Sequence, residues 1–232
     1  MFGLDMIVVS GQAKVISNFA LTHFNAAKHF SHKTREIERA HVGQPFGNFW
    51  EEISIYCASS IMTAAASLEA LINELFLSPG KLQEAVEDFD TFFWGGSVTV
   101  RRWLFFKAKK RKAGLEREPA LRKYEKAVVL LRGKPLSRTD KEFSAAEALM
   151  GFRNHLVHFK PLWDEERRND DLEQRLSGLF ELSPYPDKGA SFLAMKCMSA
   201  GCSAWAVQTV AGFVDYFSTR SGLRDKKFGS FR

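Results

Sequence analysis

The sequence predicts an all-α protein, a multi-helix bundle that carries one inserted basic segment. Apolar residues recur at spacings of three and four over long stretches, which is the period of a helix with one buried face. Strictly alternating apolar and polar runs are scarce. The 232-residue chain is 45% hydrophobic and contains 21 phenylalanines, which is enough to build one sizeable core.

The first half of the chain predicts two long helices and a short one, separated by breaks that contain Gly and Pro. Val15 and Phe19 begin the apolar stripe of the first helix. In the second helix an apolar face runs from Ile53 to Leu75, and Pro79 follows its end. These helices are expected over residues 12–40, 49–77 and 81–93.

The second half predicts four more helices. Pro119 stands at the first turn of one, Asp140 precedes the next, and a Pro-rich turn at residues 183–186 introduces the last. Residues 97–114 fit a strand or a helix, and the tail over residues 219–232 is expected to fray. The four helices are expected over residues 119–131, 140–159, 172–180 and 190–218.

Positive charge is concentrated in one segment. Residues 101–138 hold 14 Lys and Arg against three acids, a local charge of +11, whereas the remainder has a net charge of −5 within a total of +6. We expect a single domain over residues 1–232, with its helical core at about 49–218 and a basic insertion at about 95–138. The uneven charge predicts an anionic partner.

Cysteine usage and hydropathy indicate a cytoplasmic protein. Cys57, Cys197 and Cys202 are too few and too scattered for a disulfide framework, so they are expected to be reduced core thiols. Residues 1–10 lack the basic region of a secretory signal. The most membrane-like stretch, residues 197–214, is interpreted as a buried helix, so no membrane association is expected.

Neither a metal nor a cofactor is expected. His29 and His32 have the spacing of a metal-binding pair, but the sequence offers no third ligand. It also contains no Gly-rich phosphate loop, nucleophile elbow or paired-carboxylate motif. Nucleotide-driven enzymes and triad hydrolases are therefore disfavoured.

The cluster Arg153, Asn154 and His158 is the strongest candidate for chemistry. On a helical wheel at about 100° per residue, Leu149 and Phe152 fall on a core face, and Asn154 and His158 lie nearly opposite. A polar face that also includes a glycine predicts packing on two sides, and another subunit is one candidate for the second side. A titratable imidazole beside a permanent cation suits phosphate chemistry, because one moves protons and the other holds negative charge.

A family resemblance rests on these residues. The string RNHLVH at residues 153–158 resembles the Arg-x4-His signature of the HEPN superfamily, in which a polar residue often follows the Arg. Upstream, LEALIN at residues 68–73 is similar to an "LEA-x-x-N" stretch of many HEPN-like proteins, and the order of elements over residues 49–218 also fits. The bare Arg-x4–6-His pattern is weak, since Arg35 and His41 satisfy it too.

The resemblance implies a helical bundle that dimerises and brings two motifs into one cleft. It implies a metal-independent endoribonuclease, in which His158 is the general acid and base, Arg153 stabilises the phosphorane and Asn154 orients the phosphate or the imidazole. The products would carry 2′,3′-cyclic phosphate and 5′-OH ends. Glu69 and Asn73 would face the motif helix and hold its polar residues in place.

The basic insertion is the predicted RNA-binding element, because RNA binding uses cations for the backbone and aromatic side chains for unstacked bases. Its local alternative is an exposed charged loop whose aromatic residues pack into the bundle. The nominated residues are Arg101, Arg102, Lys107, Lys109, Lys110, Arg111 and Lys112.

Three functional interpretations follow. The first is an endoribonuclease acting as a homodimer, as a toxin of a toxin–antitoxin pair or a phage-defence effector, with an antitoxin or regulatory protein as a further partner. The second is a non-catalytic HEPN-like module that binds RNA, a nucleotide or a protein. The third is a helical scaffold, in which Arg153 and His158 form a solvated helix end, Asn73 is an interhelix amide and Glu69 pairs with a nearby base.

Overall fold

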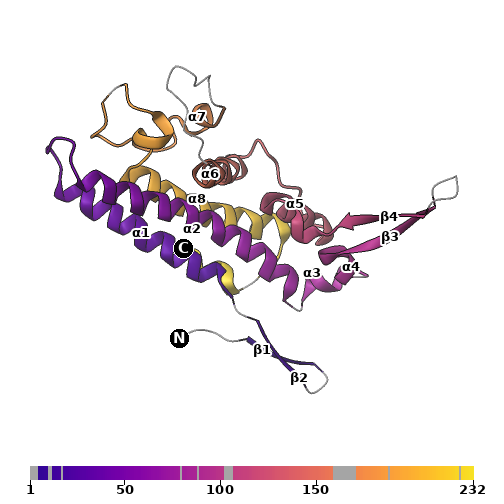
Figure 1. Ribbon diagram of the computed structural model, residues 1–232. Helices are drawn as coiled ribbons and strands as arrows, with labels where there is room; N and C mark the ends of the chain where they lie inside the picture. Colours follow the sequence, from indigo (N-terminus) through magenta and orange to yellow (C-terminus); the bar gives the residue numbers. More distant parts are fainter. Residues whose placement is uncertain are drawn as a thin grey trace.

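Long helices make up the body of the protein in the computed structural model (Figure 1). Helices α1 (Ala20–Ala40), α2 (Phe49–Leu77) and α8 (Ala200–Ser221) run alongside one another, and α5 (Ala120–Leu130) and α6 (Lys141–Val157) pack against α2 and α8. The mostly helical fold class is therefore confirmed. The structure describes residues 5–9, 12–16, 18–78, 80–87, 89–101, 107–158, 171–187, 189–224 and 226–232.

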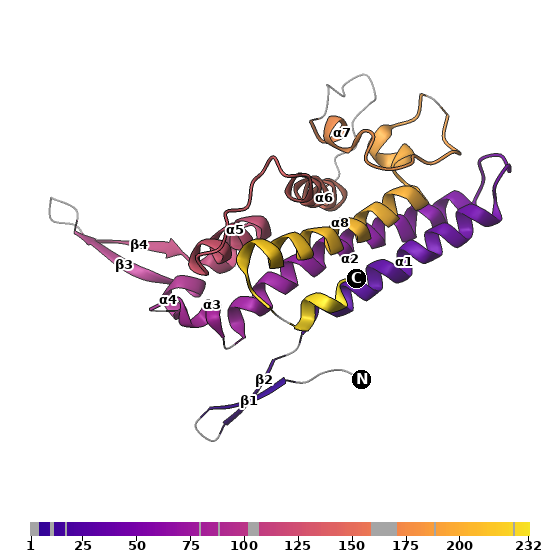
Figure 2. The same cartoon turned by 180° about the vertical axis from the view of Figure 1, so that it is seen from behind.

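Shorter elements connect these helices. They are α3 (Lys81–Glu84), α4 (Phe89–Trp94), the 3₁₀ turn η1 (Leu115–Arg117), α7 (Asp171–Leu176), the π-helical turn η3 (Phe192–Lys196) and the 3₁₀ turn η4 (Lys226–Ser230). Two antiparallel hairpins stand away from the bundle in both views, and they depart from the all-α expectation (Figure 2). They pair β1 (Asp5–Val9) with β2 (Gln12–Ile16) and β3 (Gly95–Arg101) with β4 (Lys107–Ala113).

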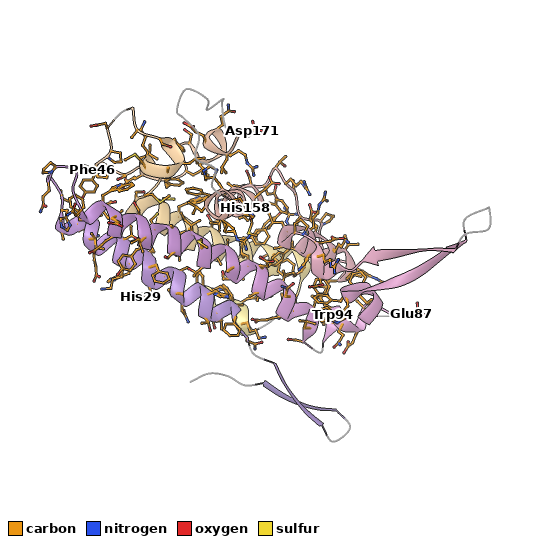
Figure 3. The ribbon with its side chains drawn as sticks, viewed as in Figure 1. His29, Phe46, Glu87, Trp94, His158 and Asp171 are labelled. Carbon is orange, nitrogen blue, oxygen red and sulfur yellow. The ribbon has the colours of Figure 1, made fainter. Side chains whose placement is uncertain are left out.

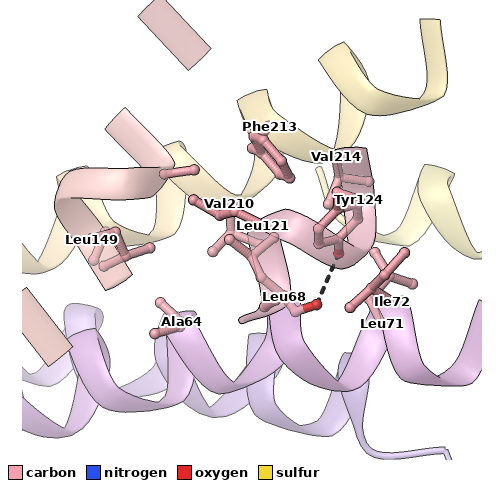
Figure 4. Close-up of a cluster of buried hydrophobic side chains, with 14 of the residues drawn as sticks. Ala64, Leu68, Leu71, Ile72, Leu121, Tyr124, Leu149, Val210, Phe213 and Val214 are labelled. Carbon is pink, nitrogen blue, oxygen red and sulfur yellow. Dashed lines mark hydrogen bonds between the residues drawn. The ribbon is translucent and has the colours of Figure 1, made fainter. Parts of the chain in front are cut away.

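The core lies where α2 meets α5, α6 and α8 (Figure 4). Leu68 of α2, Leu149 of α6 and Phe213 of α8 are fully buried there. Tyr124 of α5 is also fully buried, and its hydroxyl donates to the main-chain oxygen of Leu68 at 2.9 Å. Its ring packs edge-on against Phe213 and Phe217, with centroids 5.0 and 4.8 Å away. The abundant phenylalanines thus fill the space between helices.

Helix α1 begins later than the sequence predicts. Residues 12–16 form β2, and the helix starts at Ala20, so the expected helix over residues 12–40 is wrong in its first turns. The start is fixed by Glu74 of α2, whose Oε1 accepts from the main-chain N–H groups of Phe19 and Ala20 at 2.7 and 2.8 Å. Phe19 has no capping side chain, so this distant carboxylate satisfies the exposed donors.

Within the undecided stretch 97–114, residues 97–101 and 107–113 form most of the β3–β4 hairpin and not a helix. The hairpin projects beyond the end of the bundle near α3 and α4, and we call it the arm (Figure 1). Gly95 turns the chain from α4 into β3 at a φ of +82°, a region that favours glycine. A Cβ on Gly114 would lie 2.2 Å from the carbonyl oxygen of Phe93, so only glycine allows the two ends of the arm to meet.

The remaining helix predictions need small corrections. The helix expected over residues 81–93 is divided into α3 and α4, and the one expected over 172–180 is α7, which ends at Leu176. The last predicted helix, residues 190–218, is interrupted at Ser199. This residue caps the start of α8, because its side chain accepts from the N–H of Cys202 at 3.0 Å. The tail does not fray: Phe231 is buried, with its ring 5.0 Å from that of Phe24.

Helix α2 is long and apolar enough to cross a membrane, judged by length and composition within the described residues. Half of the qualifying window (50%) is buried inside the bundle. The stretch that looked most membrane-like in the sequence, residues 197–214, is instead divided by the start of α8. Helix α2 contacts α1, α5, α6 and α8, and its buried apolar side chains belong to the core between these helices.

The three cysteines are free and buried, as expected. Burial raises the pKa of the Cys197 thiol and that of Cys202, and Cys57 donates to the main-chain oxygen of Cys197 at 3.7 Å. Since each pKa unit removes about tenfold of the reactive thiolate, we expect native protein at pH 8 to react with Ellman's reagent more than roughly a hundredfold slower than free cysteine. All three thiols should titrate once guanidinium unfolds the chain. Rapid reaction of the native protein would contradict this packing.

Candidate functional site

Helix α6 carries the Arg153–His158 motif, and its core face is the one that the helical wheel predicts. Leu149 and Phe152 are fully buried, Leu156 packs against the core, and Asn154 is exposed. The helical wheel also places Phe159 on this face, and that residue lies outside the described residues. The start of α6 is fastened to α8, because Asp140 Oδ2 accepts from Tyr216 Oη at 2.8 Å and from Arg220 at 2.7 Å. The motif is therefore presented from a fixed helix.

The glycine-bearing side of α6 is covered by α7 of the same chain. A Cβ on Gly151 would lie 3.3 Å from Leu172 Cδ1, and Arg175 of α7 donates to Glu147 of α6 at 2.9 Å. On sequence grounds, another subunit is one candidate for packing against this side. Any intersubunit contact of α6 must therefore use its carboxyl end or the surface around Asn154.

Arg153 is held but still accessible. Its NH1 donates to Asn154 Oδ1 at 2.9 Å, and its NH2 lies 3.7 Å from Glu69 Oε2 of α2. The side chains of this ion pair are 32% and 42% exposed, and a half-exposed pair at that distance contributes little stability. Glu69 thus faces the motif helix, as the resemblance implies, and an incoming anion can compete with it for the guanidinium.

His158 stands at the C-cap of α6 and is exposed. Its main-chain N–H donates to the oxygen of Asn154 at 2.9 Å, which closes the last helical turn. Within the described part of the chain its imidazole makes no hydrogen bond or ion pair. Figure 3 shows His158 at the end of α6, above α2. The ring is therefore open to solvent, and it is not locked in apolar packing.

A cleft of about 810 Å³ opens beside Arg153, between α5, α6, η1 and α7, and we call it the Arg153 cleft. Its volume falls within the roughly 300–1,000 Å³ typical of ligand pockets. His158 does not line it. Its charged lining mixes five arginines with four glutamates, so most of the positive charge is balanced: Arg117, Arg122, Arg138, Arg153, Arg175, Glu69, Glu116, Glu118 and Glu147.

Asn73, one turn beyond Glu69, contacts α5 and not the motif helix. Its Oδ1 accepts from Lys123 Nζ at 2.8 Å. Lys123 is only 1% exposed, and burial lowers its pKa, although the Glu69 carboxylate raises it in part. The sequence interpretation overlooked this lysine. Its signal was a cation on the apolar stripe of α5, between Ala120 and Ala127, where a solvated residue is not expected.

The competing Arg35–His41 pair is built differently. His41 Nδ1 lies 2.8 Å from the main-chain oxygen of Ile37, and its ring stacks on Phe49 with centroids 4.2 Å apart. This imidazole closes a helix end and packs on an aromatic ring. The geometry therefore favours Arg153 and His158 as the pair that can meet a substrate.

Six of the seven nominated RNA-binding residues belong to the strands of the arm, and Arg102 lies outside the described residues. Alternate residues along a strand share a face, and so do directly paired residues. Arg101 pairs with Lys107, Thr99 with Lys109 and Ser97 with Arg111. One face, here called the cationic face, therefore holds Arg101, Lys107, Lys109 and Arg111. Lys110 and Lys112 belong to the other face.

The arm leads directly to the cleft. Strand β4 ends at Ala113, and the chain then passes through Gly114 into η1, whose Glu116 and Arg117 line the Arg153 cleft.

No group of three or more His, Cys, Asp or Glu side chains that could hold a metal occurs among the residues that the structure describes. Comparison of the chain with protein-family models, with curated proteins and with solved structures gave no match.

Proposed function

We propose that this chain is a metal-independent endoribonuclease of the HEPN type. One observation carries the proposal: an accessible guanidinium and an exposed imidazole stand five residues apart at the end of a helix whose other face is locked in the core. Glu69 of α2 meets Arg153, which is the interhelix contact that the resemblance implies. His41, in the competing pair, lacks this freedom.

The chemistry requires a proton acceptor, a proton donor and a cation. His158 would accept the proton of a ribose 2′-OH as its oxygen attacks the adjacent phosphorus, and an imidazolium would donate a proton to the departing 5′ oxygen. Arg153 would stabilise the extra negative charge of the phosphorane, and Asn154, bonded to Arg153, would orient the guanidinium or the phosphate. The products are 2′,3′-cyclic phosphate and 5′-OH ends.

A second copy of the chain completes the proposed site. His158 does not line the Arg153 cleft, so a single chain presents its imidazole and most of the cleft to different regions of solvent. A symmetric dimer that brings two α6 carboxyl ends together would supply a base and an acid from two imidazoles. We propose that this dimer acts in the cytoplasm as a toxin or phage-defence effector, under control of an antitoxin or regulatory protein.

The arm is the proposed RNA contact. Along β4 the cationic face places Lys107, Lys109 and Arg111 about 6–7 Å apart in a single row. A single row suits one phosphodiester strand better than the two strands of a duplex, and unpaired RNA is the form that in-line attack by the 2′-OH requires. The carboxyl end of β4 leads to the cleft, so bound RNA would extend toward Arg153.

Matched double variants of the arm test this contact. Lys107→Gln with Lys109→Gln should weaken binding of a single-stranded oligoribonucleotide and reduce the slope of log K against log salt by about 1.4, since each phosphate contact contributes about 0.7. Lys110→Gln with Lys112→Gln removes the same charge from the other face and should leave the slope nearly unchanged. Fluorescence anisotropy across a salt series measures both. Equal effects of the two pairs would contradict a one-sided contact.

Cleavage of RNA in the presence of EDTA, with 2′,3′-cyclic phosphate and 5′-OH ends on the products, is the direct test of the proposed activity. The second candidate is a non-catalytic HEPN-like module that binds RNA, a nucleotide or a protein. The position of His158 outside the Arg153 cleft favours that alternative. Salt-dependent RNA binding without cleavage by the dimer would select it.

A further inference from the structure

A second groove lies between α1 and α8. These two helices run side by side, as Figure 2 shows. The groove has a volume of about 220 Å³ and includes neither Arg153 nor His158. It is lined by Lys28, Ser31, His32 and Arg35 of α1 and by Ala204, Val207 and Gln208 of α8. Its wall on α1 therefore carries three basic side chains within two helical turns.

The basic side chains of this groove are only partly neutralised. Within the described residues, Arg35 forms no ion pair or hydrogen bond with its guanidinium. His32 Nδ1 lies 3.4 Å from Glu36, a carboxylate that also pairs with Lys33 at 2.7 Å. Lys28 Nζ donates to the main-chain oxygen of Arg232 at 3.3 Å. The groove thus keeps at least one guanidinium available for an anion.

Ser31 adds a hydroxyl donor to this groove. It is 5% exposed, and no residue of the described part accepts from its hydroxyl. In a helix such a hydroxyl usually bonds to the carbonyl four residues earlier. That carbonyl, on Ala27, instead accepts from Ser60 of α2 at 2.9 Å. The Ser31 hydroxyl is therefore left without an internal partner in a groove walled by cations.

We propose that this groove binds a tetrahedral oxyanion, either free phosphate or the terminal phosphate of a monoester. Arg35 would supply a bidentate guanidinium, Lys28 a second cation, and Ser31 and Gln208 neutral donors from two helices. The volume is smaller than the roughly 300–1,000 Å³ of sites for drug-sized ligands, so a phosphate group fits and a whole nucleotide does not. The site is independent of the nuclease proposal, because it shares no residue with the Arg153 cleft.

Calorimetric titration of the full chain with inorganic phosphate and with glycerol 3-phosphate, at constant ionic strength set by NaCl, tests this proposal. Arg35→Gln should weaken phosphate binding roughly tenfold or more, because a charge-assisted hydrogen bond is lost. Ser31→Ala should weaken it several-fold without changing the net charge. Arg39→Gln removes an exposed arginine of α1 outside the groove and should bind as the wild type does.

Circular dichroism in chloride buffer confirms that each variant is folded. Binding of the monoester but not of inorganic phosphate supports the site and identifies its ligand as a phosphomonoester, binding of inorganic phosphate alone identifies free phosphate, and binding of both shows that the shared phosphate group is what the site recognises. Absence of binding for both ligands overturns the proposal. Equal weakening by Arg35→Gln and Arg39→Gln also overturns it, since that result indicates diffuse attraction to a basic surface.

Discussion

Replacing His158 with alanine is expected to reduce the rate of RNA cleavage in EDTA by a factor of about 10²–10⁴, the usual contribution of a general acid or base. The imidazole is exposed at the end of α6 and supports no packing, so the fold should not change. Because the arm and Arg153 remain, RNA affinity should stay within about twofold of the wild-type value. Single-turnover cleavage of an end-labelled oligoribonucleotide measures the rate, and anisotropy measures the affinity.

His155→Gln is the matched control, since it changes the other imidazole in the last turn of α6. Its cleavage rate should remain close to that of the wild type. If His155→Gln loses most of its cleavage activity while His158→Ala stays active, the catalytic histidine is His155 and not His158. If His158→Ala cleaves RNA as fast as the wild type, the proposed endoribonuclease mechanism fails.

Helices with strong local signals were predictable. The bounds of α2 agree with the sequence prediction at both ends, because its apolar period is unbroken and a Ser-Pro-Gly sequence follows it. The core face of α6 was also predictable, since Leu149 and Phe152 repeat at helical spacing. In both helices the residues that decide the structure lie within the helix or directly beside it.

Elements that depend on distant partners were not predictable. The arm required knowledge that Gly95 and Gly114 come together at the bundle, which neither residue reveals alone. The tail was expected to fray because it is basic, yet Phe231 finds a pocket beside Phe24, more than 200 positions earlier in the chain. Propensity and period describe neighbours in sequence, so contacts of this kind escape them.

The residues of the candidate site also differ in whether the sequence predicts their contacts. The resemblance suggested that Glu69 faces the motif helix, and its carboxylate lies beside Arg153. The same resemblance implies that Asn73 lies there too, but Asn73 is about 6 Å further along the axis of α2, and its side chain accepts from Lys123 of α5. The arginines that α5, η1 and α7 add to the cleft carried no signal of their own, because each one also fits a solvated helix surface.

Glu74→Ala is expected to lower the free energy of unfolding by about 3 kcal/mol or more, since two hydrogen bonds to a charged acceptor are lost at about 1.5–3 kcal/mol each. The carboxylate is nearly buried and accepts from the N–H groups of Phe19 and Ala20. Without it those donors stay unpaired at the positive end of α1. For a chain of this size the loss corresponds to a decrease in Tm of about 10 °C. Urea unfolding followed by circular dichroism measures it.

Glu74→Gln separates the contribution of shape from that of charge. The amide keeps an oxygen that can accept from the same two N–H groups, so the loss should be smaller, about 1 kcal/mol for each bond, the difference between a charged and a neutral acceptor. The same carboxylate lies 3.9 Å from Lys227 in the C-terminal turn, which is longer than its two hydrogen bonds to the start of α1. Lys227→Gln should therefore have a smaller effect than Glu74→Ala. Equal losses for Glu74→Ala and Lys227→Gln would mean that Glu74 acts through the tail, and the start of α1 at Ala20 would then need another cause.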